Sequence, residues 1–270
     1  MIRLRPRQES RIPVEAECIS PDAFSGKSAA QVEDMKILWG NKTKRLVDLF
    51  EVVEDPAEPN EIVVDGDVRF VKHIGAKMSM GRVIVNGDAG MHLGRGMAGG
   101  EIIVNGDAGD WLGTEMVGGL IRVKGNVGNL AGSAYRGSKS GMKGGMIVIE
   151  GGAGDELGEL MEGGTIAVKG NVQSFAGALM SGGAIVCFGG LGGRPGAGMT
   201  NGTLLAFSQP RLLPTFRYAR TYKPTFIKPI LEELRKQGLP VEDRQIEGLY
   251  DAYEGDLACD GKGKILVWKD

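Results

Sequence analysis

The chain contains only two histidines, and their spacing is the first feature that could carry chemistry. His73 and His92 lie 19 residues apart, an interval that recurs along the chain, so we expect the two imidazoles to stack on neighbouring structural units. Such a pair could contribute to a metal site. A hydrolytic zinc site usually needs three protein ligands, and the next two positions of the series hold Trp111 and Leu130. The pattern leaves open a metal bound by the two histidines but favours a purely structural stack of their rings.

Two other patterns resemble known binding sites. Residues 94–99 read GRGMAG and match the dinucleotide fingerprint G-x-G-x-x-G. No helix pattern follows them, and the fingerprint requires one, so we do not predict a nucleotide site. Methionines also recur in one register, where thioethers could bind a soft metal. No Cys or His shares that register, so we expect a buried column instead. The column comprises Met97, Met116, Met142, Met161, Met180 and Met199.

Acidic and amide residues share a turn position in successive units. They are Asp67, Asp88, Asp107, Asn126 and Asn171. Calcium β-rolls also repeat aspartates, but with nonapeptide spacing, so we expect these side chains to form Asx turns. No serine has a plausible His and Asp partner, and two histidines leave little material for acid–base or nucleophilic catalysis. The sequence therefore predicts no catalytic, cofactor-binding or metal-binding residue on this chain.

One unit carries seven extra residues, in the segment SAYRGSKSGMKGG from Ser133 to Gly145. Insertions in repeat arrays become protruding loops on one face, and Tyr and Arg are enriched at protein interfaces. We predict that this loop contacts a partner or an anionic substrate group, the alternative being an ordinary surface loop. The predicted contact residues are Tyr135, Arg136, Lys139 and Ser140.

The elements that position these residues are set by glycine spacing. Glycines open successive units at 19-residue steps, broken by one step of 26, from Gly81 to Gly202. Each unit, such as GRVIVNGDAGMHLGRGMAG, reads as a short alternating strand followed by glycine turns. Frequent glycine disfavours helix. We expect Val83 and Val85, with their equivalents in the other units, to face inward. The predicted fold is all-β: a right-handed parallel β-helix (β-solenoid) of about seven Gly-rich coils.

We expect mixed α/β caps at both ends of these coils. The three predicted segments are an N-terminal capping segment (1–60), a β-helix repeat domain (61–207) and a C-terminal helix and strand for capping or docking (208–270). Ser28 and Gln31 form a capping box that opens a short helix, and the acidic segment from Glu54 to Glu61 links this cap to the coils. In the last segment a helix should begin near Pro229, and a strand should cover 265–268.

Composition limits the partners and the compartment. The 32 Lys and Arg residues nearly balance 34 Asp and Glu, so we expect neither nucleic acid nor a membrane surface as a partner. Cys18, Cys187 and Cys259 are an odd number and lie far apart, which is typical of reduced thiols in a cytoplasmic protein. The N-terminal residues do not read as a signal peptide, and no run of 18 apolar residues occurs.

Four stretches together resemble the C subunit of formylmethanofuran dehydrogenase, over nearly the whole chain. They are the run PVEAECISPDAFSGKSAAQVEDMKILWGN, the NGDAG and MxGG units, the YRG insertion before GMKGG, and the terminal YEGDLACDGKGKI. The glycine-rich units alone are also similar to the C-terminal β-helix domain of glutamate synthase. The flanks and the insertion therefore carry the resemblance.

This resemblance implies a non-catalytic scaffold subunit of an oxidoreductase complex. Such a complex reduces CO2 and fixes it onto methanofuran, the first step of methanogenesis. It implies no cofactor on this chain, with a Mo- or W-pterin, iron–sulfur clusters and a binuclear metal site on partner subunits: the molybdopterin, iron–sulfur and amidohydrolase subunits. Two alternatives remain: the C subunit of a formyltransferase/hydrolase complex of methylotrophic one-carbon metabolism, and a freestanding glutamate-synthase-type module.

Overall fold

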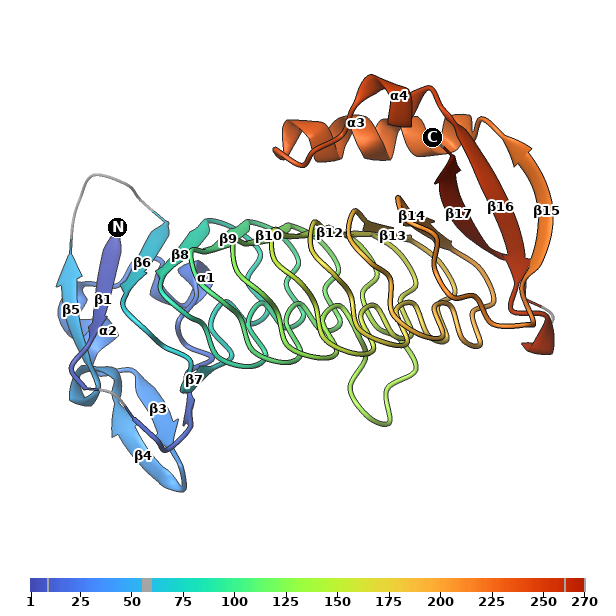
Figure 1. Ribbon diagram of the computed structural model, residues 1–270. Coiled ribbons are helices and arrows are strands. Elements are labelled where there is room, and N and C mark those ends of the chain that lie inside the picture. Colours follow the sequence, from blue (N-terminus) through green and yellow to red (C-terminus); the bar gives the residue numbers. More distant parts are fainter. Residues whose placement is uncertain (9, 55–59, 260, 270) are drawn as a thin grey trace.

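The computed structural model describes residues 1–8, 10–54, 60–259 and 261–269. A sheet of 13 strands runs along the molecule, in the order β15-β16-β17-β14-β13-β12-β11-β10-β9-β8-β6-β1-β5 (Figure 1). Most of the acidic segment predicted to link the first cap to the units lies outside the described residues. The central strands are β6 (Glu61–Asp65), β8 (Arg82–Asn86), β9 (Glu101–Val104), β10 (Leu120–Val123), β11 (Met146–Ile149), β12 (Thr165–Val168), β13 (Ala184–Cys187) and β14 (Thr203–Ala206).

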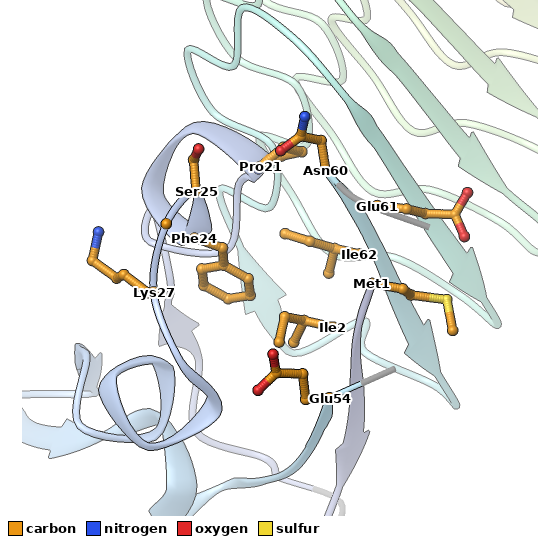
Figure 2. Close-up of a pocket in the computed structure, with 11 residues that line it drawn as sticks. Met1, Ile2, Pro21, Phe24, Ser25, Lys27, Glu54, Asn60, Glu61 and Ile62 are labelled. Atoms are coloured by element: carbon orange, nitrogen blue, oxygen red, sulfur yellow. The ribbon is translucent and has the colours of Figure 1, made fainter. Parts of the chain in front are cut away.

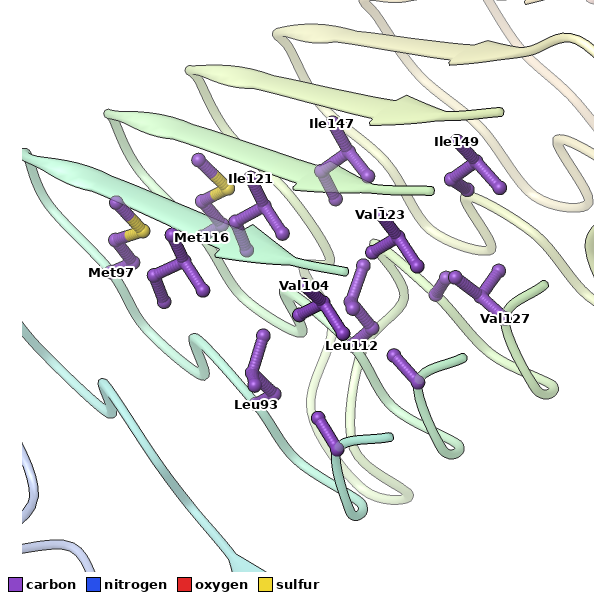
Figure 3. Close-up of a cluster of buried hydrophobic side chains, with 14 of the residues drawn as sticks. Leu93, Met97, Val104, Leu112, Met116, Ile121, Val123, Val127, Ile147 and Ile149 are labelled. Atoms are coloured by element: carbon purple, nitrogen blue, oxygen red, sulfur yellow. The ribbon is translucent and has the colours of Figure 1, made fainter. Parts of the chain in front are cut away.

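These central strands are parallel and share one register. Val83 faces Ile102 and Val85 faces Val104, so residues 19 apart are neighbours, and the strands on either side of the insertion pair with a step of 26. The predicted inward ladders are confirmed, because Val83, Ile102 and Val104 are fully buried. Figure 3 shows such side chains between the strands and the segments that return beneath them. Burying each one contributes about 1.5–3 kcal/mol relative to exposure.

The predicted fold class needs correction. A parallel β-helix of strands and corners would carry strands on several faces, whereas here each unit from Gly81 onward contributes one strand and all of these strands join a single mixed sheet. The returning parts of the units contain turns and single bridges, such as Ala89 with Ala108. The physical reason is the backbone: residues with positive φ, such as His92 and Gly94, interrupt any extended run there. The observed fold is therefore a mostly parallel 13-stranded sheet with antiparallel strands at both ends.

The methionine column is buried, as predicted. Met97 and Met116 are fully buried, as are the other members of the register. Each terminal methyl group lies against a glycine of the next unit. A Cβ built on Gly119, whose φ is +87°, would lie 2.6 Å from Cε of Met97. Glycine at this position therefore provides both the left-handed backbone and the space that the thioether fills.

The acidic and amide side chains at the shared turn position stabilise the stacking of neighbouring units rather than the turns in which they lie. Oδ1 of Asp88 accepts a hydrogen bond from the backbone N–H of Asp107 (2.9 Å), and Oδ1 of Asp107 accepts one from the N–H of Asn126 (2.6 Å). Only Asp67 accepts from within its own turn, from the N–H of Arg69 (3.0 Å). The predicted Asx turns are thus wrong for these later positions, where each side chain reaches the next unit.

The N-terminal end combines short strands and helices. Strand β1 (Ile2–Pro6) is parallel to β6 and antiparallel to β5 (Phe50–Glu54). A four-stranded sheet comprises β4 (Lys42–Arg45), β3 (Lys36–Trp39), β2 (Val14–Glu15) and β7 (Val71–Lys72). The helices are α1 (Pro21–Phe24), α2 (Ala29–Glu33) and η1 (Leu46–Asp48). The predicted capping box of Ser28 and Gln31 opens α2.

The C-terminal elements extend the sheet and cover part of its outer face. They are β15 (Arg217–Tyr222), η2 (Thr225–Ile227), α3 (Lys228–Lys236), α4 (Asp243–Ile246), β16 (Leu249–Gly255), η3 (Leu257–Cys259) and β17 (Gly263–Lys269). The predicted helix and final strand are α3 and β17. Leu231 and Leu234 of α3 are buried in one cluster with outward side chains of β11–β14, such as Val186, and Figure 1 shows α3 running along the sheet. No helix in the described part of the chain has the length and apolarity to cross a membrane.

Candidate functional site

The two histidines and the insertion meet on one side of the molecule. The rings of His73 and His92 stack with centroids 4.7 Å apart and planes 10° apart, as the sequence predicted. The ring of Trp111 continues the stack, 5.2 Å from His92. We call these three residues the aromatic column.

The backbone gives the column its geometry. His73, His92 and Trp111 all have left-handed φ values, of 68°, 63° and 59°. This conformation costs about 1–2 kcal/mol for a residue with a Cβ. The same turn recurs in each unit, so their side chains leave the backbone in the same direction and stack at the spacing of the units.

Tyr135 of the insertion packs onto this column. Its hydroxyl lies 2.7 Å from Nδ1 of His92, and its ring centroid lies 5.4 Å from that of His92. Burial, and then His73, lower the pKa of His92 to about 4, whereas burial raises the pKa of Tyr135 to about 12. At neutral pH both groups are therefore uncharged, and the imidazole tautomer decides which of the two donates.

Arg95 also packs against the ring of Tyr135. Its guanidinium lies 5.4 Å from the centre of the Tyr135 ring, and it pairs with Glu17 at 3.3 Å. Burial also lowers the pKa of His73, whose Nδ1 is buried without a hydrogen-bond partner among the described residues. The arrangement fastens the insertion to the body through stacking, a cation–π contact and one hydrogen bond.

The four predicted contact residues divide into two pairs. Ser140 turns toward the body, where its Oγ donates to Oε1 of Glu162 (2.7 Å), and Tyr135 does the same through His92. Arg136 and Lys139 are exposed, and neither forms an ion pair with any described residue. Sequence reasoning missed Arg95 and the contact between Tyr135 and His92. Tyr135 lies in a different unit from His92 and Arg95, so the spacing gave no local signal of these contacts.

The thiols and acidic groups show no reactive arrangement in the described part of the chain. Burial raises the pKa of both Cys18 and Cys187 to about 11, so both thiols are protonated at neutral pH. All three cysteines are free. Within the described ranges, no cluster of three or more His, Cys, Asp or Glu side chains could hold a metal ion.

A separate hollow of about 260 Å³ lies at the N-terminal end (Figure 2). Ile2, Phe24 and Ile62 contribute its apolar lining, and Glu54 and Glu61 lie at its margin. One Glu54 oxygen already accepts a hydrogen bond from the N–H of Ala29 at the start of α2 (3.3 Å). The hollow contains none of the residues that the sequence predicted to be functional.

Two groups of known proteins are similar to this chain, although no family model matches it. The C subunit of the tungsten-containing formylmethanofuran dehydrogenase 2 of Methanothermobacter wolfeii is 41% identical over 93 residues, which are 33% of this chain and 34% of that protein. The C subunit of the molybdenum-containing formylmethanofuran dehydrogenase 1 of Methanosarcina barkeri is 44% identical over 91 residues, covering 33% of this chain and 30% of that protein. These matches therefore span about a third of the relatives' length.

A solved structure matches over the full length. It is a chain in the crystal structure of the formyltransferase/hydrolase complex from Methylorubrum extorquens in complex with methylofuran. The match has a TM-score of 0.91 and 36% identity, and it covers 99% of this chain and 100% of that one. A match of this extent and identity shows common family membership. Taken with the dehydrogenase relatives, it shows that the chain belongs to the family of formylmethanofuran dehydrogenase C subunits.

Proposed function

We propose that this chain is a non-catalytic scaffold subunit of a formylmethanofuran dehydrogenase complex, which reduces CO2 and fixes it onto methanofuran in the cytoplasm. The observation that carries the proposal is the match along 99% of the chain with one chain of a formyltransferase/hydrolase complex. Segment 61–207 would space the partners, and segments 1–60 and 208–270 would dock them.

The polar side chains of the chain form contacts between units, which supports a structural role for the protein. His92 shares a hydrogen bond with Tyr135 that holds the insertion, and Asp88 and Asp107 bind backbone N–H groups of the next unit. The methionines fill the core. Residue types that elsewhere bind metals or transfer protons are thus engaged in holding one unit to the next.

In this proposal the redox and metal chemistry belongs to partner subunits. A molybdopterin subunit would hold the Mo- or W-pterin, iron–sulfur subunits would hold the clusters, and an amidohydrolase subunit would hold a binuclear metal site. The tungsten and molybdenum forms among the relatives support this assignment. We place no cofactor, nucleic acid or membrane contact on this chain.

The insertion is the proposed contact with a partner. Tyr135 and Ser140 hold the loop against the body, and this leaves Arg136 and Lys139 as two positive charges without an ion pair among the described residues. A partner surface with carboxylates at this position would complement them. Because the loop is already fastened, binding would cost little ordering entropy.

A second function has specific support. The full-length structural match is to a formyltransferase/hydrolase complex, whereas the dehydrogenase relatives match over a third of the chain. The chain would then be the C subunit of a complex that transfers and hydrolyses formyl groups.

Native purification with mass spectrometry and metal analysis separates these functions. A complex with a molybdopterin subunit and stoichiometric Mo or W supports the dehydrogenase. A complex of comparable size that lacks both metals supports the formyltransferase/hydrolase. A chain that purifies as a monomer without partner subunits contradicts the scaffold role.

The contact residues are tested by a double variant, Arg136→Ala with Lys139→Ala. We expect the yield of intact complex to fall by about tenfold, because two complementary charges are lost, while the thermal midpoint of the isolated chain stays within about 1–2 °C. The control is Lys124→Ala with Lys169→Ala, two exposed lysines at strand ends. Equal yields from both variants would exclude an interface role for the loop.

A further inference from the structure

Strand β15 is the open edge of the 13-stranded sheet. It pairs only with β16, and Figure 1 shows it as the outermost strand at the C-terminal end. Its outward backbone N–H and C=O groups have no partner among the described residues, and such an edge is a template for a further strand. At the opposite edge, by contrast, the Glu54 side chain of β5 binds the start of α2.

The side chains of this edge have the composition of an interface. Residues 217–220 are all exposed. Tyr218 is 57% exposed, the highest value among the large hydrophobic side chains described, and Leu249 follows at 51%. Leu257 is 40% exposed at the other end of the strand, where its N–H bonds to the carbonyl of Thr215. Tyrosine and arginine beside exposed apolar groups are enriched where proteins bind one another.

The edge is also positively charged. Arg217 and Arg220 form no ion pair with any described residue, although Glu254 faces Arg217 in the register, and Arg220 stacks on the ring of Tyr222 at 4.6 Å. Asp251, a nearby carboxylate of β16, already accepts a hydrogen bond from Thr221. An added strand with carboxylates would complement these two guanidinium groups.

We propose that an acidic, extended segment of a partner subunit adds to β15 as a further strand of the sheet. The backbone of β15 supplies the hydrogen bonds, Arg217 and Arg220 bind the carboxylates, and Tyr218 packs against the apolar side chains of the added segment. This inference rests on the proposed function, because a complex must supply the segment.

Hydrogen exchange of the isolated chain and of the natively purified complex tests the added strand. We expect the amides of β15 to exchange at least about tenfold more slowly in the complex, while those of β16 are protected in both samples. A complex that forms but leaves β15 exchanging as in the isolated chain overturns this inference and leaves the scaffold role intact. If no complex forms, both fail.

Charge reversal tests the chemistry of the partner. Arg217→Glu with Arg220→Glu should lower the recovery of intact complex by about tenfold or more, and the matched control is Lys124→Glu with Lys169→Glu, which changes the net charge equally. Equal recovery from the two variants overturns the acidic partner. So does self-association of the isolated chain that protects β15, since the occupant would then be a second copy.

Discussion

At the scale of single residues, the hydroxyl of Tyr135 is the polar link between the insertion and the aromatic column. Tyr135→Phe keeps the ring but removes the bond to His92. We expect a loss of about 1 kcal/mol in the free energy of unfolding, measured by urea denaturation, and faster amide exchange across residues 134–141. Tyr222→Phe is the control, because that hydroxyl has no hydrogen bond among the described residues. A loop unaffected by the first change would show that stacking alone holds it.

The histidine makes stability depend on pH in a defined direction. The pKa of His92 falls from 6.5 to about 4 on folding, so between these values the unfolded chain binds a proton that the folded chain does not. Stability from this residue is therefore complete above pH 6.5 and decreases as the pH falls toward 4. His92→Asn, which tolerates the left-handed backbone, should lose less stability between about pH 7 and pH 5 in urea titrations. If the unfolding free energies of the variant and the unmodified chain fell equally with pH, this expectation would be contradicted.

Some of these residue-scale features were accessible from the sequence. Equal spacing predicted the stack of His73 on His92, because neighbouring units place equivalent residues together. The partner of Tyr135 was not accessible, since His92 lies 43 residues earlier and nothing in the spacing relates an inserted residue to the register. The left-handed backbone at Trp111 was equally hidden, because residues with a Cβ rarely adopt it.

At the scale of elements, the fit between glycine and methionine can be measured. Gly119 and Gly238 have similar φ values, of +87° and +83°, but a Cβ added at Gly119 would meet Met97, whereas one added at Gly238 would have no neighbour within 4 Å. Gly238→Ala should cost about 1–2 kcal/mol from backbone strain alone. Gly119→Ala should cost a further 1–3 kcal/mol, roughly, from overpacking. A Cβ at Gly119 would also lie 2.8 Å from the backbone oxygen of Gly100, so the extra loss reports contact with both neighbours. Chemical denaturation of both variants checks this, and equal losses would show that the packing around Gly119 yields without cost.

The element pattern explains where the fold prediction succeeded and failed. Alternation along each unit predicted the strands and their inward residues, because a strand presents every second side chain to one face. The prediction of a β-helix failed for the rest of the unit, because glycines and left-handed turns leave no strand there. The sequence did contain evidence for the position of α3 on the outer face. Val148 and Val186 point outward and are apolar, whereas Arg122, at the equivalent position of an earlier strand, is charged.

At the scale of the whole molecule, the common register predicts which deletions are tolerated. Removing residues 165–183 joins Gly164 to Ala184, which faces Thr165 in the present register, so every remaining strand keeps its inward face. We expect a folded, soluble chain that loses the bonds from Arg122 to Gln237. Removing residues 165–182 should prevent folding of the following strands, because a shift of one residue exchanges the two faces. Circular dichroism and thermal melts of the two variants distinguish these outcomes.

The constant step between neighbouring strands has a consequence for the design of an assembly. Each unit advances the chain by one strand spacing, about 4.8 Å, without altering the surfaces at the two ends. The distance between a protein held by the N-terminal strands and one held by β15 could thus change during evolution in discrete increments. In the proposed complex, gain or loss of a whole unit would then change the separation of two docked partners while their docking contacts stayed the same.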